Sequence, residues 1–286
     1  MDNMVDVRNL KKYFPVKGGF IQHTLGYVQA VDDISFTIQK GKVLGLVGES
    51  GCGKSTAGRT ILGLTPATEG QVLIDGVDVC TATGDAMHTL RKKMQIIFQD
   101  PYSSLDPRMT VYDLIGEGLA AHKLVSSRIE LEEKVEAIME KCGLFPEQAL
   151  RFPHQFSGGQ RQRISIARAL AASPEFVVCD EAVSALDVSI QAQIINLLKD
   201  MQEDMGLTYL FISHDLSIVR FISDDVAVMY LGQIVEMGSK KQIFDAPAHP
   251  YTQALLSAAP AFTRKEKREN KRILLDSDPT TTYNSP

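Results

Sequence analysis

Residues 48–56, which read GESGCGKST, constrain the fold of this chain more than any other stretch. They fit the pattern GxxxxGKS/T and stand between a buried apolar run, residues 43–48, and a helical stretch that begins at Lys54. In this context the loop curls its backbone N–H groups around phosphate oxygens, and the following helix adds the positive end of its dipole. The sequence therefore predicts an α/β protein that binds a nucleotide.

The residues of this loop match the needs of a bound triphosphate and its metal ion. Lys54 can reach the β- and γ-phosphates, and the hydroxyl group of Ser55 can ligate Mg²⁺. The predicted nucleotide-binding residues of the loop are Gly48, Glu49, Ser50, Gly51, Cys52, Gly53, Lys54, Ser55 and Thr56. GTPases, kinases and transport ATPases share such a loop, so this segment alone leaves the reaction open.

Short β-rich runs alternate with helical stretches along the chain, which is typical of a layered α/β protein. Residues 100 to about 172 contain no predicted strand, and we interpret them as a helical insert. Helices that simply cover a sheet would give the same periodicity. Residues 15–27 we interpret as a glycine-containing loop. Strands are predicted in residues 28–38, 43–48, 94–98, 176–180 and 208–213, helices in 111–119, 131–142 and 190–205, and a hairpin in 226–238 that turns at Gly232 and Gln233.

A second chemical signal is FVVCDE, residues 176–181, an apolar strand that ends in two acids. Asp180 is placed to hold Mg²⁺, and Glu181 to polarise the water molecule that attacks the γ-phosphate. A strand that merely ends in acids at the surface is an equally common interpretation of these residues in isolation. Because a phosphate loop is present in the same chain, we favour the catalytic interpretation.

A third signal is FSGGQRQR, residues 156–163, which leads into a helical stretch. Ser157 and the N–H groups of Gly158 and Gly159, with Gln160 beside them, fit an anion-binding helix terminus. A serine N-cap followed by a tight entry turn is the alternative. Since the phosphate loop already binds one face of a nucleotide, a second anion site raises the question of which phosphate it serves.

Composition and charge exclude several classes of function. The formal net charge is −5, so no basic field indicates a nucleic-acid partner. No apolar run reaches the roughly 18 residues of a membrane-spanning helix, and the first residues lack the apolar region of a secretory signal. Any role at a membrane is therefore expected to come through partner proteins. The cysteines, Cys52, Cys80, Cys142 and Cys179, show no CxxC spacing, as in a cytosolic protein with reduced thiols.

Taken together, the segments GESGCGKST, IIFQD, FSGGQ, VVCDE, SALD and ISHD resemble the nucleotide-binding domain of ABC transporters. The resemblance implies a P-loop NTPase core with a mixed sheet, an antiparallel β subdomain and an inserted helical subdomain. It also implies ATP and Mg²⁺ as cofactors. In that family two such domains pair head to tail, so that the serine–glycine signature of one contacts the γ-phosphate bound by the other.

The same resemblance assigns roles to residues that stand alone in the sequence. Gln99 resembles the glutamine that contacts Mg²⁺ or the attacking water and signals to the membrane subunits. Asp187 resembles the residue that links the two sites of the pair. Phe14 occupies the offset of the aromatic residue that stacks on adenine, with Tyr13 and Tyr27 as alternatives. The implied catalytic residues are Glu181, His214 and Gln99, with His214 hydrogen-bonding the γ-phosphate, and the implied metal-binding residues are Ser55, Gln99 and Asp180.

Longer segments, among them IIFQDPYSSLDPRMTV and HPYTQALLSAAP, resemble the oligopeptide/dipeptide permease branch over roughly residues 4–275. The resemblance implies an ATP-hydrolysing importer subunit that drives peptide uptake at the cytoplasmic face of a bacterial or archaeal cell membrane. Its implied partners are a second ATPase chain, expected to be a paralogue, two transmembrane permease subunits and, indirectly, an extracytoplasmic solute-binding protein. An importer of nickel or another small solute is an alternative, as is a soluble ABC ATPase. P-loop kinases and GTPases lack the SGGQ signature.

Three features depart from the pattern of that family. Phe156 replaces the usual leucine before SGGQ, and Ala182 stands where proline normally follows the catalytic glutamate, which restores a backbone N–H group. No cysteine lies beyond Cys179, so we expect no iron–sulfur cluster of the kind that many relatives carry. Residues 1–263 are assigned to the nucleotide-binding domain and residues 264–286 to a charged and polar C-terminal extension, expected to be extended or poorly ordered.

Overall fold

The computed structural model describes residues 2–18, 23–258 and 283–284. The chain forms two compact units, the first made of residues 1–82 and 211–286 and the second of residues 83–210. The predicted helical insert lies wholly within the second unit. The expected C-terminal extension lies outside the described residues except for Tyr283 and Asn284, and the domain boundary at residue 263 stays a prediction.

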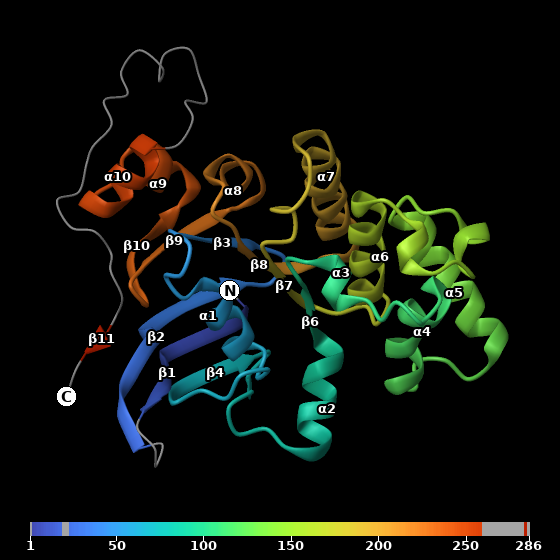
Figure 1. Ribbon diagram of the computed structural model, residues 1–286, viewed down its shortest axis with the longest axis horizontal. Helices are drawn as coiled ribbons and strands as arrows, with labels where there is room; N and C mark the ends of the chain where they lie inside the picture. Colours follow the sequence, from blue (N-terminus) through green and yellow to red (C-terminus); the bar gives the residue numbers. More distant parts are fainter. Residues whose placement is uncertain (1, 19–22, 259–282, 285–286) are drawn as a thin grey trace. The chain divides into compact units, whose positions relative to one another are not determined.

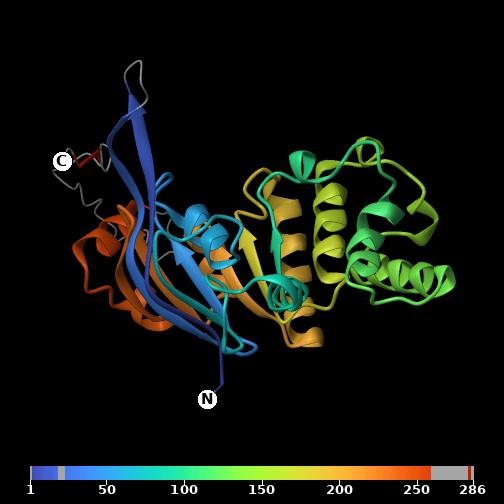
Figure 2. The same ribbon diagram turned by 90° about the horizontal axis from the view of Figure 1, so that it is seen from below.

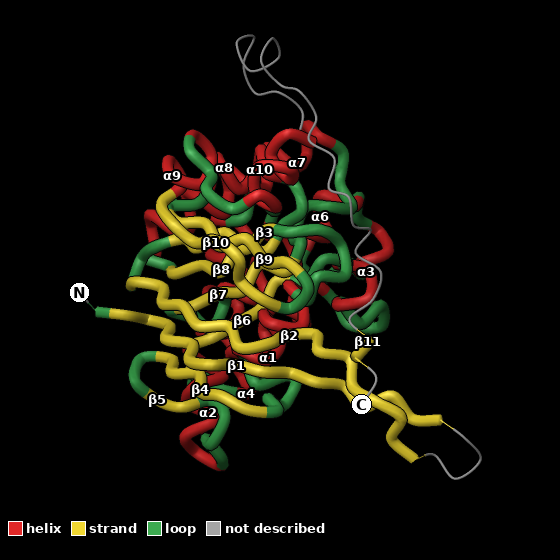
Figure 3. The backbone as a smooth tube through the Cα atoms, turned by 90° about the vertical axis from the view of Figure 1, so that its left-hand side faces the viewer, coloured by secondary structure: helices red, strands yellow, loops and turns green. Residues whose placement is uncertain are grey.

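An antiparallel sheet forms one layer of the first unit (Figures 1 and 3). Its strand order is β11-β2-β1-β4-β5, with antiparallel pairing throughout. In the first half of β1 the apolar residues Met4, Val5, Val7 and Leu10 are buried, as expected for a sheet with one covered face. Register shifts between Asn3 and Val5 and between Val7 and Leu10 interrupt a strict alternation. The strands are β1 (Asn3–Gly18), β2 (His23–Gln39), β4 (Glu69–Ile74), β5 (Val77–Asp78) and β11 (Tyr283–Asn284).

The interpretation of residues 15–27 as a loop was wrong, because β1 and β2 continue through most of this segment. Pro15 pairs with Tyr27 and Val16 with Gly26, so the two strands form one long hairpin. Figure 2 shows this hairpin, in dark blue, extending past the other strands of its sheet. Proline and glycine indicated a break, but cross-strand pairing outweighs their local preferences, and register shifts absorb the irregularity.

A second group of strands in the first unit has the order β10-β9-β3, with β9 parallel to β3 and antiparallel to β10. The predicted turn of the β9–β10 hairpin was displaced by one residue. Leu231 and Gly232 make the turn, both with positive φ angles of 46° and 86°, as a two-residue hairpin loop requires. The remaining elements of this unit are β3 (Val43–Val47), α1 (Lys54–Ile61), α8 (Leu216–Ile222), β9 (Asp225–Tyr230), β10 (Gln233–Ser239), α9 (Lys240–Asp245) and α10 (Pro250–Ala258).

The second unit joins two parallel strands, β6 and β7, to the helical insert. Between β6 and β7 the described chain forms helices without an intervening strand, which confirms the insert (Figure 1). The chain passes back to the first unit within β8. The elements are α2 (Gly84–Lys93), β6 (Met94–Ile97), α3 (Pro101–Ser104), α4 (Val111–Ala121), α5 (Arg128–Lys141), η1 (Pro146–Gln148), η2 (Pro153–Gln155), α6 (Gly158–Leu170), β7 (Phe176–Asp180), α7 (Val188–Met205) and β8 (Thr208–Ile212).

Buried apolar strands form the interior of each unit. All residues of β3, β7 and β8 are buried, in agreement with their continuous apolar sequences. The cysteines form no disulfide, and three of them are buried. Within the described part of the chain, no helix has the length and apolar character needed to cross a membrane.

Candidate functional site

The phosphate loop of the first unit connects the buried strand β3 to α1. Two glycines allow its close packing: a Cβ atom on Gly48 would collide with the carbonyl oxygen of Met229, and one on Gly53 with that of Ala30. Both glycines have positive φ angles, 152° and 108°. Gly51 differs, because its φ is 83° but no atom lies within 4 Å of its Cβ position. The loop therefore presses against β2 and β9 on one side and is open at Gly51.

The lysine of the loop is held by the loop itself. Lys54 is only 4% exposed, and its Nζ donates hydrogen bonds of 2.8 Å to the carbonyl oxygens of Gly48 and Glu49. No side chain caps the N terminus of α1, and the first turn of this helix carries no acidic residue. A cationic amine and an uncapped helix terminus both favour an anion. The loop thus fits a nucleotide phosphate. Ser55 lies in the first turn of α1, and its role as a ligand of Mg²⁺ stays a prediction.

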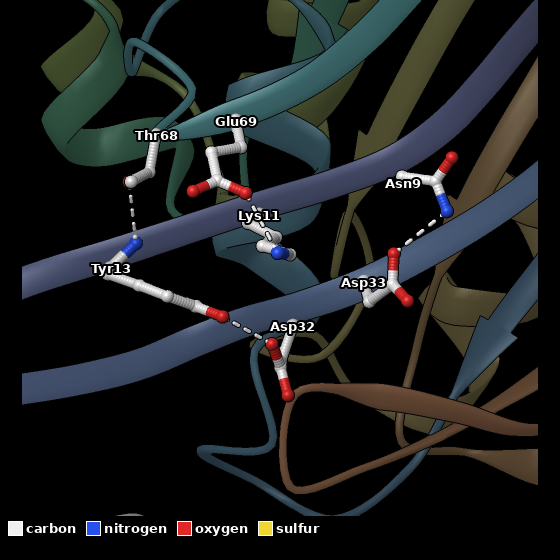
Figure 4. Close-up of polar contacts among 7 residues, drawn as sticks. All are labelled: Asn9, Lys11, Tyr13, Asp32, Asp33, Thr68 and Glu69. Carbon is white, nitrogen blue, oxygen red and sulfur yellow. Dashed lines mark hydrogen bonds and ion pairs between the residues drawn. The ribbon is translucent and has the colours of Figure 1, made fainter.

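The structure separates the three aromatic residues considered for the adenine. The hydroxyl group of Tyr13 donates a hydrogen bond to Asp32 (Figure 4). Asp32 also accepts a hydrogen bond of 2.8 Å from Gln233, so Tyr13 belongs to a polar cluster. Phe14 is 40% exposed and Tyr27 is 51% exposed. The Nζ atom of Lys12 lies 4.8 Å from the centroid of the Phe14 ring. Phe14 and Tyr27 are thus the more exposed of the three rings, whereas Tyr13 is half-buried.

Electrostatics agree with this arrangement around Asp32. The hydrogen bonds from Tyr13 and Gln233 hold the pKa of the Asp32 carboxyl group below its usual value. Burial, followed by the bond to Asp32, raises the pKa of the Tyr13 hydroxyl group to about 12. The pair is thus a neutral phenol donating to a carboxylate at physiological pH.

The first unit also places the predicted histidine near the end of β3. The N–H group of Ser213 donates a hydrogen bond of 3.2 Å to the carbonyl oxygen of Leu46 in β3. His214 follows directly and is exposed. Asp215 then caps α8, since its Oδ1 accepts a hydrogen bond of 2.8 Å from the N–H group of Ser217. His214 is therefore fixed between two well-defined elements, beside the strand that leads into the phosphate loop.

The second unit brings two of the predicted catalytic residues into contact. The Nε2 atom of Gln99 donates a hydrogen bond of 3.0 Å to Oε2 of Glu181. Glu181 follows β7 with a φ angle of 49°, an uncommon value for a residue with a side chain. Asp180, the last residue of β7, is buried, as is Ala182. The strained turn after β7 therefore directs the two acids differently, with Asp180 inside and Glu181 toward Gln99.

The serine–glycine signature forms the N terminus of α6. Ser157 and Gln160 make a capping box: Oγ of Ser157 accepts from the N–H group of Gln160 at 3.3 Å, and the glutamine oxygen accepts from Ser157 N–H at 3.0 Å. A Cβ atom on Gly159 would lie 2.6 Å from Ile190. Ser157 and Gly158 are exposed. The N-cap interpretation is thus confirmed, and it leaves this helix terminus accessible to an anion of another molecule.

One residue that contacts the phosphate loop is not among those that the sequence predicted for the site. Tyr251, in the HPYT segment, accepts a hydrogen bond of 3.1 Å on its hydroxyl oxygen from the N–H group of Glu49. Burial raises the pKa of this hydroxyl group to about 12, so it stays neutral. The segment was noted for its resemblance to one transporter branch, but nothing in the sequence linked it to a loop some 200 residues earlier.

Two family models match the chain. The ABC transporter family matches residues 31–184, which include the phosphate loop, the signature and both acids. The C-terminal region of oligopeptide/dipeptide transporters matches residues 235–283, which include the HPYT segment.

Curated proteins and solved structures give the same result. The chain is 50% identical, over 286 residues, to the oligopeptide transport ATP-binding protein AppF of Bacillus subtilis (strain 168), covering 100% of this chain and 87% of that protein. It is 53% identical over 260 residues to OppF, also an oligopeptide transport ATP-binding protein of that strain, covering 91% and 83%. The dimeric ATP-binding cassette MJ0796 bound to ADP and Pi superposes with a TM-score of 0.73 at 28% identity, covering 83% of this chain and 99% of that one.

Proposed function

The chain belongs to the ABC transporter family, in its oligopeptide/dipeptide branch, and we propose that it is the ATP-hydrolysing subunit of a peptide importer. The observation that carries this proposal is the combination, in one chain, of a phosphate loop around a buried lysine with a C-terminal region matched to oligopeptide/dipeptide transporters. Two relatives, 50% and 53% identical to this chain, are named for oligopeptide transport, which favours peptides over nickel as the solute.

In this proposal each of the predicted site residues has a separate role in ATP hydrolysis. Lys54 and the N–H groups of the phosphate loop bind the phosphates, and Phe14 stacks on the adenine. Ser55, Asp180 and Gln99 would hold Mg²⁺, which would supply neutralisation of charge on the phosphates. Glu181 orients the attacking water and accepts its proton, while the hydrogen bond from Gln99 fixes the Glu181 carboxylate.

Pairing with a second ATPase chain completes each site. The exposed signature at Ser157 and Gly158, with Gly159 and Gln160, binds the γ-phosphate held by the partner chain. The capped N terminus of α6 supports this role, because its dipole and accessible backbone favour an anion. His214 hydrogen-bonds the γ-phosphate, and Asp187 at the N-cap of α7 links the two sites of the pair. We propose a paralogue as the partner, as is common in this branch.

A cavity in the second unit is our candidate for contact with the permease at the cytoplasmic face of the membrane. It has a volume of about 760 Å³ and is lined by residues 102–109 together with Leu114, Glu117 and Arg168. Arg168 restrains the backbone of this lining, because it donates a hydrogen bond of 2.7 Å to the carbonyl oxygen of Ser104. The lining begins at Tyr102, three residues after Gln99. A displacement of Gln99 in the nucleotide site would therefore move the residues that contact a bound permease segment.

The proposal is tested by purifying the complex through a tag on this chain from detergent-solubilised native membranes. We expect mass spectrometry to find two polytopic permease subunits and a second ATPase, and we expect peptide with its solute-binding protein to stimulate ATP hydrolysis. Stimulation by nickel but not by peptide would support the alternative importer. Recovery of a soluble chain with ribosomal or DNA-repair proteins would contradict transport while leaving ATP hydrolysis intact.

A further inference from the structure

The HPYT segment contacts a peptide group at the start of the phosphate loop. The N–H group of Glu49 donates a hydrogen bond of 3.1 Å to the hydroxyl oxygen of Tyr251. The carbonyl group of the same peptide unit belongs to Gly48, and it accepts the 2.8 Å hydrogen bond from Lys54 Nζ. A trans peptide unit is planar, and its N–H and C=O groups point in opposite directions. Tyr251 and Lys54 therefore hold this unit from opposite sides.

Two further contacts fix the position of Tyr251. Its ring is 4% exposed, and its centroid lies 4.3 Å from that of Tyr230 at the end of β9. Its N–H group donates to Nδ1 of His249 at 3.1 Å, which orders the start of α10. The hydroxyl group therefore has little freedom to leave Glu49, because both the ring and the backbone of Tyr251 are restrained.

A carboxylate on β10 anchors the whole segment. Glu236 accepts hydrogen bonds from the N–H groups of Ala248 at 2.8 Å and His249 at 3.0 Å, one on each oxygen. Burial alone would raise the pKa of Glu236, but the hydrogen bonds it accepts bring that pKa below its usual value. Charge-assisted hydrogen bonds of this kind are stronger than neutral ones. The chain of contacts thus runs from β10 through the HPYT segment to the phosphate loop.

We infer that Tyr251 is a positioning residue of the nucleotide site, which holds the Gly48–Glu49 peptide unit and through it the ammonium group of Lys54. The inference rests on the proposed function, because it takes this loop as the binding site for the triphosphate of ATP. It also gives the C-terminal region a role in ATP binding, in addition to its resemblance to one transporter branch. A ring that only packed α10 against β9 would need no hydroxyl group at this place.

The test compares ATP dissociation constants of full-length variants by equilibrium dialysis. Tyr251→Phe keeps the ring and removes the acceptor for Glu49 N–H, so we expect ATP to bind about tenfold more weakly. Tyr209→Phe is the matched control, since Tyr209 is a buried tyrosine of the second unit whose hydroxyl group donates one hydrogen bond of 3.0 Å to Leu198. That control should bind ATP as the wild type does.

A double variant tests whether Tyr251 acts through the lysine. In a Lys54→Ala background, adding Tyr251→Phe should change ATP affinity by less than about twofold, because the group that Tyr251 positions is gone. Unchanged affinity in Tyr251→Phe alone, or an equal loss in both backgrounds, would overturn the inference. A wild-type chain that bound no ATP would instead overturn the proposed function, so the two failures are distinguishable.

Discussion

Two glycines of the phosphate loop should respond very differently to the same substitution. Gly51→Ala places a Cβ atom in open space, so its cost is the backbone strain of a φ of 83°, about 1–2 kcal/mol. Gly53→Ala has similar strain at a φ of 108°, but its Cβ atom collides with the Ala30 carbonyl oxygen and lies 2.9 Å from the Met229 side chain. Overpacking of this kind adds about 1–3 kcal/mol. We therefore expect Gly53→Ala to lower the free energy of unfolding by about 2–5 kcal/mol.

Urea unfolding followed by circular dichroism measures both variants against the wild type. The difference between the two variants, about 1–3 kcal/mol, isolates the collision because strain is common to both. Gly53→Ala should also displace β2 or the loop and so weaken ATP binding more than Gly51→Ala does. Equal destabilisation by the two substitutions would refute the close packing of the loop against β2.

Three further predictions concern catalysis and pH. Glu181→Gln should slow ATP hydrolysis by about 10²–10⁴-fold while ATP still binds; near-normal turnover of the purified complex would remove Glu181 from its role. Ala182→Pro should change the ATPase rate less than about tenfold, because proline restricts the strained residue before it without touching the phosphates; a completely inactive but folded variant would contradict this. Hydrogen bonds from Tyr13 and Gln233 lower the pKa of Asp32, so its stabilisation is present above about pH 4 and is lost as the pH falls further. Urea titrations of Asp32→Asn and wild type should therefore converge at acid pH, and a gap that widened there would show the opposite sign.

The sequence predicted the elements whose signal is local. Three elements combine an apolar pattern with a glycine or a capping residue at one end: the phosphate loop, the strand that ends at Asp180 and the helix after Ser157. The structure confirms all three. Periodicity also predicted the helices of the insert, although helices that cover a sheet would have given the same pattern. These elements carry most of the residues that the proposed mechanism uses.

The features that the sequence did not predict depend on contacts between residues far apart in the chain. Proline and glycine, which favour loops, occur in residues 15–18 and 23–27. These residues form strands only because β1 and β2 pair with each other there. The contact of Tyr251 with Glu49 joins residues separated by 202 positions, and no local pattern records it. The hydrogen bond of Tyr13 likewise joins it to Asp32, which lies on a different strand.

Peptide uptake into proteoliposomes is the measurement that tests the central claim most directly. The complex purified through this chain would be reconstituted with its solute-binding protein outside and ATP inside, and accumulation of a labelled oligopeptide would be followed. We predict uptake that requires ATP and falls to background when this chain carries Glu181→Gln. Uptake that continued without ATP hydrolysis by this chain, or no uptake of any peptide by an active ATPase complex, would contradict the account.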